Sequence, residues 1–296
     1  MLTHMGRASP GAKVVVLGSR GFIGRNLVPF LQEAGFKVDA VSSQEIDLTN
    51  PSSVSALAEK FKTCDHLIML SCLTPDKGKG QDTLMKNILM AKHVCDALAL
   101  QDRRPHVVYF SSDSVYSFEE SLIQERMMPS PVDIYGAMHR LRELMFMEAV
   151  PDNLAIIRPT LVYGPGDTHN SYGPNRFRRE AFGEGSVTLF GAGEDTRAHI
   201  FIDDLVKLTL LIIQNKSIGI LNGAPDTSIT YGDLAVLVGE CLKIAPEIKQ
   251  KSRAAAPTHR YFETSCCYEA FPGFTFTSLE EGLAKTYEKM LEDPNA

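Results

Sequence analysis

Lys13-Val-Val-Val-Leu-Gly-Ser-Arg-Gly-Phe-Ile-Gly24 joins an apolar run to three glycines and opens a helical segment. Gly18 can take a tight turn, Gly21 lets a backbone approach a pyrophosphate, and Gly24 lets the helix pack closely on the strand. The amides and the positive dipole end of that helix then face the anion. The stretch predicts a cradle for a dinucleotide cofactor, NAD or NADP, formed by Gly18, Arg20, Gly21, Phe22, Ile23 and Gly24.

Short apolar runs alternate with longer helical segments along the chain. Gly35 is a natural end for the first helix, and an apolar run at 37–41 follows it, which completes a βαβ unit. Further apolar runs lie at 66–70, 106–110, 154–157 and 218–221, and helical patterns at 83–100 and 134–148. This alternation predicts an α/β fold with a doubly wound parallel (Rossmann) sheet, whose ligand lies outside the carboxyl ends of the strands.

The composition of the chain changes after Gly164, because residues 164–197 are rich in Gly, Pro, Asn and Arg. We expect a dinucleotide-binding domain over 12–164, with the segment 199–222 rejoining its sheet, and a smaller substrate-binding region over 165–296. Helical patterns near 231–242 and 278–291 belong to that region, which carries no further motif.

Composition narrows the class of protein. The chain has 296 residues, 44% of them hydrophobic, and a net charge of −6, which describes a globular protein and argues against a nucleic-acid partner. Six cysteines show no CxxC pair and no metal-ligand spacing, and no apolar run reaches the roughly 18 residues of a membrane helix. With no apolar leader at its start, we expect a cytoplasmic protein without a metal, a membrane partner or disulfides.

A second group of polar residues follows the fourth predicted strand. Ser111-Ser112-Asp113-Ser114-Val115-Tyr116 ends that strand, and Tyr135-Gly136-Ala137-Met138-His139 comes shortly after it. Arg-Pro-x-x-Val-Tyr-Gly-Pro at 158–165 and Arg-x-x-Ile-x-Ile-Asp-Asp at 197–204 continue the series. Together with the glycine stretch, this order of motifs resembles the extended short-chain dehydrogenases/reductases that act as sugar-nucleotide epimerases, dehydratases and ketoreductases. The resemblance runs from about residue 13 to 222.

The resemblance implies catalytic roles for three side chains. Tyr135 matches the tyrosine that exchanges a proton with a sugar hydroxyl while the nicotinamide exchanges a hydride at the same carbon. Ser112 matches the residue that bonds the reacting oxygen, and Asp113 stands where dehydratases carry an acid. Taken alone, these residues could equally be a packed tyrosine at a helix start, a cap hydroxyl, and a helix N-cap or loop acid.

His139 departs from the family pattern, which places a lysine four residues after the tyrosine. Position i+4 lies on the same helix face, so His139 is expected at the catalytic site. A lysine charge about 5 Å away would lower the tyrosine pKa by about two units at an effective dielectric of about 20. An imidazole is mostly neutral at pH 7, although it can still bond the nicotinamide ribose. Arg140 and Arg142 are expected on other faces of the helix.

Two further departures concern the substrate. Leu161 replaces an asparagine that touches the sugar nucleotide in many relatives, and Ser114 follows Asp113 where dehydratases carry glutamate. Dehydration is therefore the third choice of reaction.

The end of the second strand bears on the choice between NAD and NADP. Ser42 stands where an acid would bond the adenosine ribose of NAD, and with Ser43 and Arg20 it favours the 2′-phosphate of NADP. Asp47, followed by Leu48, matches the acid set against the adenine; alternatively, it caps a helix that starts near Pro51. Other cofactor contacts implied by the resemblance are Ser71, Ser111, Tyr135, His139 and Pro159.

Basic and amide side chains after residue 174 suggest where a diphosphate binds. The candidates are Asn175, Arg176, Arg178, Arg179 and Arg197, with Thr74 on the sugar side. Arg197 matches a diphosphate-binding arginine of the family, whereas a solvated helix face explains 176–179 equally well.

These observations predict an NAD(P)-dependent sugar-nucleotide oxidoreductase that transfers a hydride at a ring carbon, as a 4-ketoreductase or an epimerase. Because of His139 and Leu161, the alternative is a non-catalytic member that binds NAD(P) and a sugar nucleotide. The resemblance also implies a homodimer that forms through a helix pair including the Tyr135 helix.

Overall fold

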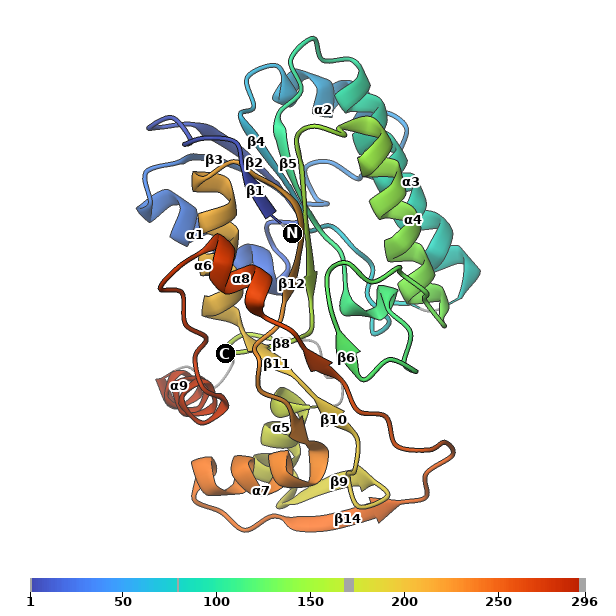
Figure 1. The fold of residues 1–296 in the computed structure, drawn as a ribbon, viewed down its shortest axis with the longest axis vertical. Helices are drawn as coiled ribbons and strands as arrows, with labels where there is room; N and C mark the ends of the chain where they lie inside the picture. Colours follow the sequence, from blue (N-terminus) through green and yellow to red (C-terminus); the bar gives the residue numbers. More distant parts are fainter. Residues whose placement is uncertain (1, 79, 168–172, 293–296) are drawn as a thin grey trace.

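The computed structural model describes residues 2–78, 80–167 and 173–292 and has a seven-stranded sheet at its centre (Figure 1). Its strands, in spatial order, are β1 (Leu2–His4), β12 (Ser217–Gly223), β7 (Leu154–Pro159), β5 (His106–Phe110), β4 (His66–Met69), β2 (Lys13–Leu17) and β3 (Lys37–Val41). All neighbours are parallel except β1, which pairs antiparallel with β12 at the edge. The predicted doubly wound α/β fold is confirmed.

Helices cover both faces of the sheet, because its strands are apolar on both sides. α1 (Phe22–Glu33) and α6 (Ile202–Gln214) pack on the face to which Val14 and Val16 point. α2 (Ser53–Phe61), α3 (Gln81–Ala99) and α4 (Ile134–Ala149) cover the face of Val15 and Leu17. Figure 1 shows these two layers to the left and right of the strands.

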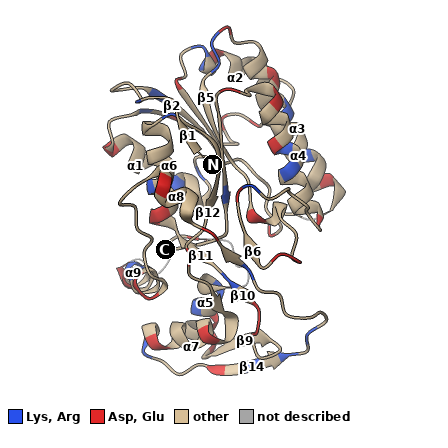
Figure 2. Ribbon diagram, in the orientation of Figure 1, with Lys and Arg blue, Asp and Glu red and all other residues tan. Residues whose placement is uncertain are grey.

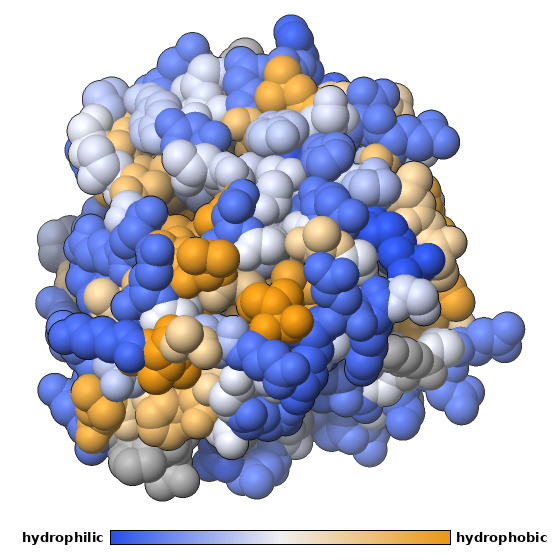
Figure 3. Space-filling model, turned by 90° about the horizontal axis from the view of Figure 1, so that it is seen from below, coloured by the Kyte–Doolittle hydropathy of each residue, from blue (hydrophilic) through white to orange (hydrophobic). Residues whose placement is uncertain are grey.

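A smaller lobe lies beyond the carboxyl ends of the strands, at the bottom of Figure 1. It contains α5 (Pro174–Glu184), α7 (Tyr231–Leu242) and the parallel pair β9 (Ser186–Phe190) and β14 (Glu247–Lys251). Figure 3 views the molecule from this end and shows apolar residues in separate patches among hydrophilic ones. Exposed apolar side chains of this lobe include Phe182 and Val236.

Short strand pairs and the C-terminal helices connect the lobe to the sheet. The strand pairs are β8 (Leu161–Tyr163) with β11 (His199–Phe201), β10 (Thr196–Arg197) with β13 (Ile229–Thr230), and β6 (Leu122–Ile123) with β15 (Tyr261–Phe262). The helices are α8 (Ser265–Ala270) and α9 (Leu279–Glu292), and a 3₁₀ turn, η1 (Asp113–Val115), follows β5.

One expectation about the sheet needs correction, and one strand of the sheet was not expected. The segment around Ile200 does not rejoin the main sheet, because β11 pairs only with β8, and within 199–222 the strand that joins is β12. The edge strand β1 was not expected. The division of the chain near residue 164 into two domains stays a prediction.

The surface agrees with the mixed charge of the sequence. Figure 2 shows acidic and basic residues close together along α3 and α4. No helix of the described residues is long and apolar enough to cross a membrane. The six cysteines are free thiols, and no cluster of His, Cys, Asp or Glu suited to a metal ion occurs within the described part of the chain.

Candidate active site

The glycine turn after β2 has the shape of an anion cradle. Gly18 has φ +93°, and a Cβ there would lie 2.9 Å from the backbone nitrogen of Ser71. A Cβ on Gly24 would lie 2.5 Å from the oxygen of Gly18, so only glycine permits this approach of helix and turn. Gly21 caps α1 without a side-chain bond, which leaves the first amides of the helix available to an anion. These residues fit a dinucleotide pyrophosphate.

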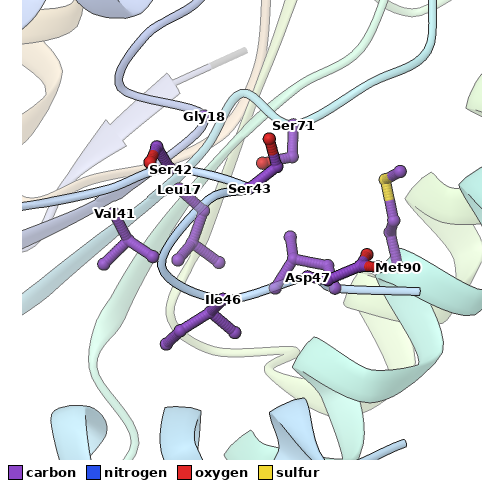
Figure 4. Close-up of a pocket in the computed structure, with 10 residues that line it drawn as sticks. Leu17, Gly18, Val41, Ser42, Ser43, Ile46, Asp47, Ser71 and Met90 are labelled. Atoms are coloured by element: carbon purple, nitrogen blue, oxygen red, sulfur yellow. The ribbon is translucent and has the colours of Figure 1, made fainter. Parts of the chain in front are cut away.

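A hollow continues from the cradle along the ends of β2, β3 and β4 (Figure 4). It is lined by Leu17, Gly18, Val41, Ser42, Ser43, Ile46, Asp47, Leu48, Ser71 and Met90. The structure therefore brings together the predicted cofactor residues Gly18, Ser42, Ser43, Asp47, Leu48 and Ser71.

Asp47 has a defined conformation at the edge of this hollow. Its carboxylate accepts hydrogen bonds from the backbone nitrogen and the hydroxyl of Thr49, at 2.9 and 2.8 Å, and these bonds lower its pKa. α2 begins only at Ser53, and Ser52 donates to Asn50 instead. The alternative that Asp47 caps this helix is wrong.

Hydroxyls and one guanidinium follow the ends of β3 and β2, the positions that bear on the choice between NAD and NADP. Arg20 is exposed and donates to the side chain of Gln44. Glu45 is the acid that follows Ser43 in the sequence, and its carboxylate pairs with the ammonium of Lys60 at 2.8 Å. The acid that lines the hollow among the described residues is Asp47.

The N-terminus of α4 is pressed against η1, and this contact places Tyr135 near the Ser-Ser-Asp segment. Asp133 caps α4 by accepting from the backbone nitrogen of Gly136 at 2.7 Å. A Cβ on Gly136 would lie 2.1 Å from the oxygen of Ser114, so the glycine after Tyr135 is required for this approach. The sequence motif Tyr-Gly therefore has a steric reason.

Tyr135 is half-buried, and burial raises the pKa of its phenol well above the usual 10. Cys72, Tyr109 and Asp113 raise it further. The group that opposes them is Arg142, whose charge lowers the pKa of this phenol. At neutral pH Tyr135 is thus a protonated phenol, ready to donate.

Ser112 and Asp113 occupy the start of η1. The Ser112 hydroxyl accepts from the backbone nitrogen of Ser114 at 3.1 Å and caps this turn, as its alternative interpretation predicted. Asp113 does not cap a helix. Its pKa is raised by burial, and Arg260 lies 3.8 Å from its carboxylate and donates to its backbone oxygen at 2.9 Å.

His139 is only 2% exposed, and both of its ring nitrogens face protein groups. Nδ1 lies 2.8 Å from the hydroxyl of Tyr109, and Nε2 lies 3.8 Å from the sulfur of Cys72. Its ring packs edge-on against Tyr135, with centroids 4.7 Å apart. Burial and the charge of Arg142 hold the pKa of His139 well below 6.5, so this imidazole is neutral at pH 7.

The expectation that Arg142 lies on a different face of α4 from Tyr135 is wrong. It is fully buried, donates to the backbone oxygen of Ser71 at 2.8 Å, and stands over the ring of Tyr109, 5.2 Å from the centroid. Seven residues make nearly two full helical turns, so Arg142 returns to the side of Tyr135. Arg140 is half-exposed and pairs with Glu143 at 3.0 Å.

A second buried network lies beside the site. Glu143 accepts two bonds from Arg158, both at 2.8 Å, and one from the hydroxyl of Ser111 at 2.6 Å. Arg158 also donates to Tyr116 at 2.8 Å. The hydroxyl of Ser111, predicted to contact the cofactor, is therefore engaged by Glu143.

Two other predicted contacts, Pro159 and Thr74, lie at or after the carboxyl ends of strands. Pro159 ends β7 opposite Gly223. Thr74 is half-buried in a turn after β4, and Leu161 begins β8.

The predicted diphosphate residues do not form one cluster. Asn175 is buried and donates to Asp167, and Arg176 pairs with Glu180 at 2.7 Å, one helical turn on. Arg178 is buried against Met290, and Arg179 donates to the oxygen of Asp167. The pairing of Arg176 favours the helix-face interpretation for this residue.

Arg197 lies apart from these residues, near a cation that sequence reasoning missed. It donates to the oxygen and hydroxyl of Thr258, at 2.8 and 2.6 Å. Its guanidinium stands 5.7 Å from the ring centroid of Phe118, and that of Arg260 stands 4.8 Å from the same centroid. Arg260 comes from the C-terminal segment, where no motif pointed to it.

The chain is similar to several known sugar-nucleotide enzymes. A GDP-6-deoxy-D-talose 4-dehydrogenase from Aggregatibacter actinomycetemcomitans is 29% identical over 222 residues, which cover 71% of this chain and 74% of that protein. A UDP-glucuronic acid 4-epimerase from Bacillus cereus, solved with NAD, superposes with a TM-score of 0.78 at 19% identity, covering 95% of this chain and 99% of the other. A GDP-L-fucose synthetase from Naegleria fowleri, bound to NADP, gives 0.81 at 14% identity, covering 99% and 96%.

The two structural likenesses agree with the fold described above. The model of one protein family matches residues 14–222, the part of the chain that carries the cradle, the Ser-Ser-Asp turn and Tyr135. The resemblance found in the sequence is thereby confirmed: this chain belongs to the NAD dependent epimerase/dehydratase family.

Proposed function

We propose that this protein is an NAD(P)-dependent sugar-nucleotide oxidoreductase, a 4-ketoreductase or an epimerase, with Tyr135 as its proton donor and acceptor. The observation that supports the proposal is the contact of Gly136 with η1, which brings the start of α4, where Tyr135 lies, to the turn that Ser112 caps. Family membership and the sugar nucleotides named for the similar proteins support this reaction class.

The cofactor would lie in the cradle and hollow, held by the glycine turn, Ser42 and Asp47. Its nicotinamide supplies or takes the hydride. Tyr135 gives a proton to the sugar oxygen in the reducing direction and takes one in the oxidising direction. Ser112, which lies in the same turn as Asp113, would hydrogen-bond that oxygen and orient it.

The sugar nucleotide would bind on the side of the smaller lobe. Arg197 and Arg260 flank Phe118 close to Asp113, and two guanidiniums suit a diphosphate. Asn175, Arg176 and Thr74 remain candidates for contacts farther along the substrate. Ser114 after Asp113 keeps dehydration the third choice.

We propose a preference for NADP. Arg20 is exposed and bonds Gln44, the neighbour of Ser43 in the chain, and Glu45 is bound to Lys60, so we expect a 2′-phosphate at Ser42 and Ser43 to meet one guanidinium and two hydroxyls. Arg20→Ala should weaken NADP binding about tenfold and leave NAD binding within about twofold, measured by fluorescence titration. Equal losses for both cofactors would contradict the preference.

One experiment separates the possible activities. The purified protein is checked for retained nucleotide and titrated with NAD(H) and NADP(H), and nucleotide-diphosphate sugars and their 4-keto forms are then added while the absorbance of reduced nicotinamide is followed. Consumption of reduced cofactor with a keto sugar identifies a reductase. Retained cofactor and an isomerised sugar identify an epimerase. Tight binding with an unchanged sugar would overturn the proposal and favour a non-catalytic binding member.

The assembly state is a separate proposal. α3 and α4 pack side by side, and Met85, Leu141 and Leu144 expose apolar side chains on them. We propose a homodimer through this helix pair, to be tested by the mass in sedimentation equilibrium. The free thiols accord with the cytoplasmic location proposed from the sequence.

A further inference from the structure

Arg142 is a buried cation without a carboxylate. It is 0% exposed, its hydrogen bonds go to the backbone oxygen of Ser71 and to the sulfurs of Met138 and Cys72, and its Nε has no hydrogen-bond partner among the described residues. No acid in the described part of the chain forms an ion pair with it. A guanidinium in this state is costly to bury, because its lost hydration is not replaced.

Arg142 and Tyr135 share neighbouring groups, among them Tyr109 and Cys72. Its guanidinium is near the segment after β4, which lines the cofactor hollow, and over the ring of Tyr109. The titratable or charged groups that act on Tyr135 are Cys72 after β4, Tyr109 of β5, Asp113 of η1 and Arg142 of its own helix, and its ring contacts His139. Burial raises the pKa of Cys72 and Tyr109 and lowers that of His139, so these three are neutral at pH 7. Arg142 is the cation of this group.

We propose that Arg142 is the fixed positive charge of the active site and takes over, at the phenol of Tyr135, the electrostatic role of the lysine that His139 replaces. The inference rests on the proposed function, in which Tyr135 is the proton partner. Arg142 is a positioning residue that acts on Tyr135 through its charge.

Helix geometry explains the exchange of positions. The i+4 side chain, His139, points at Tyr109 and packs on the Tyr135 ring, whereas the i+7 side chain extends from the next turn toward Ser71. The long arginine side chain therefore brings its charge back to the site from one turn farther along the helix.

The first test reads the charge without turnover. In the proposed reaction the nicotinamide must lie next to Tyr135, and its oxidised form carries a positive charge that Arg142 repels. Arg142→Met, an apolar replacement of similar length, should lower the ratio of the dissociation constants for NADP⁺ and NADPH about fivefold or more, measured by calorimetry. Arg142→Lys should keep the ratio within about twofold. Arg140→Met is the matched control, because it removes a charge from the half-exposed face of the same helix.

The second test uses the pH dependence of sugar oxidation, where Tyr135 must be deprotonated. Loss of a nearby cation raises the tyrosine pKa, so the rising limb of kcat/KM against pH should move up by about one pH unit in Arg142→Met and stay in place in Arg142→Lys. A uniform loss at every pH, with the limb unmoved, would indicate a structural role and overturn the inference. If Arg142→Met does not fold, Arg142→Gln serves in both tests.

The two proposals can fail separately. An unchanged affinity ratio in Arg142→Met overturns the role of Arg142 even in an active enzyme. A shifted ratio in a protein that turns over no sugar nucleotide supports the charge of Arg142 and contradicts the proposed function instead.

Discussion

Two buried arginines near α4 have opposite surroundings. Arg158 is held by both oxygens of Glu143 and by the hydroxyl of Tyr116, so its charge is compensated within the fold. Arg142 has one strong hydrogen bond, to a backbone oxygen, and an aromatic face. A buried charged side chain therefore need not contribute to the stability of the fold. The paired arginine joins β7 to α4, whereas the unpaired one lies at Ser71 and Tyr109, beside the proposed site of proton and hydride exchange.

Removing the partner of the paired arginine should have the largest effect. Glu143→Ala leaves Arg158 buried without a carboxylate, and we expect the free energy of unfolding to fall by about 3–5 kcal/mol. Chemical denaturation with urea measures this loss.

Arg140→Ala is the control for that experiment, because it removes a half-exposed partner of the same Glu143. It should lower the free energy of unfolding by less than about 1 kcal/mol. Equal losses in the two variants would contradict the assignment of the Glu143–Arg158 pair to stability.

Because Arg142 already supplies a positive charge, we expect a specific effect when His139 is replaced by the lysine of the family. His139→Lys places an ammonium beside Arg142 at a buried position and removes the contact with Tyr109, so we expect kcat/KM at pH 7 to fall about tenfold. If His139 were only a poor substitute for lysine, the activity would rise. In an Arg142→Met background the same change should increase kcat/KM, which steady-state kinetics can check.

The smallest effect is expected for the stability of Arg142→Met. No acid loses its partner in this variant, and an apolar side chain replaces an incompletely bonded guanidinium, so the free energy of unfolding should change by less than about 1 kcal/mol. A loss as large as that of Glu143→Ala, measured in the same urea titration, would erase the contrast between the two arginines.

The sequence predicted what local chain geometry determines. The cradle depends on three glycines within seven residues, because Gly18 adopts a positive φ and Gly21 and Gly24 leave no Cβ where the turn and the helix approach. β5 and α7 follow from apolar patterns at their own positions. The strand β1 could not be predicted in this way. It has three residues and is stabilised by pairing with Gly219, Ile218 and Ser217, far along the chain.

The candidate site could likewise be predicted only where its residues belong to local motifs. Tyr135, Ser112 and Asp113 belong to motifs, and the contact of Gly136 with η1 brings their segments together. Arg260 reaches Asp113 from a distant segment, so no local pattern could show it. Arg142 did have a signal, since i+7 returns to the face of Tyr135, but its direction depends on the packing of α4 over β5.

Transfer of deuterium from the cofactor to the sugar would show whether Tyr135 exchanges the proton of the reaction. Reduced cofactor carrying deuterium at the transferring carbon is mixed with a 4-keto nucleotide sugar and either the native protein or Tyr135→Phe, and the sugar is analysed by mass spectrometry. We expect deuterium on the sugar ring with the native protein, and at least about 100-fold slower labelling with Tyr135→Phe at unchanged cofactor affinity. Equal labelling rates in both proteins would contradict the role of Tyr135.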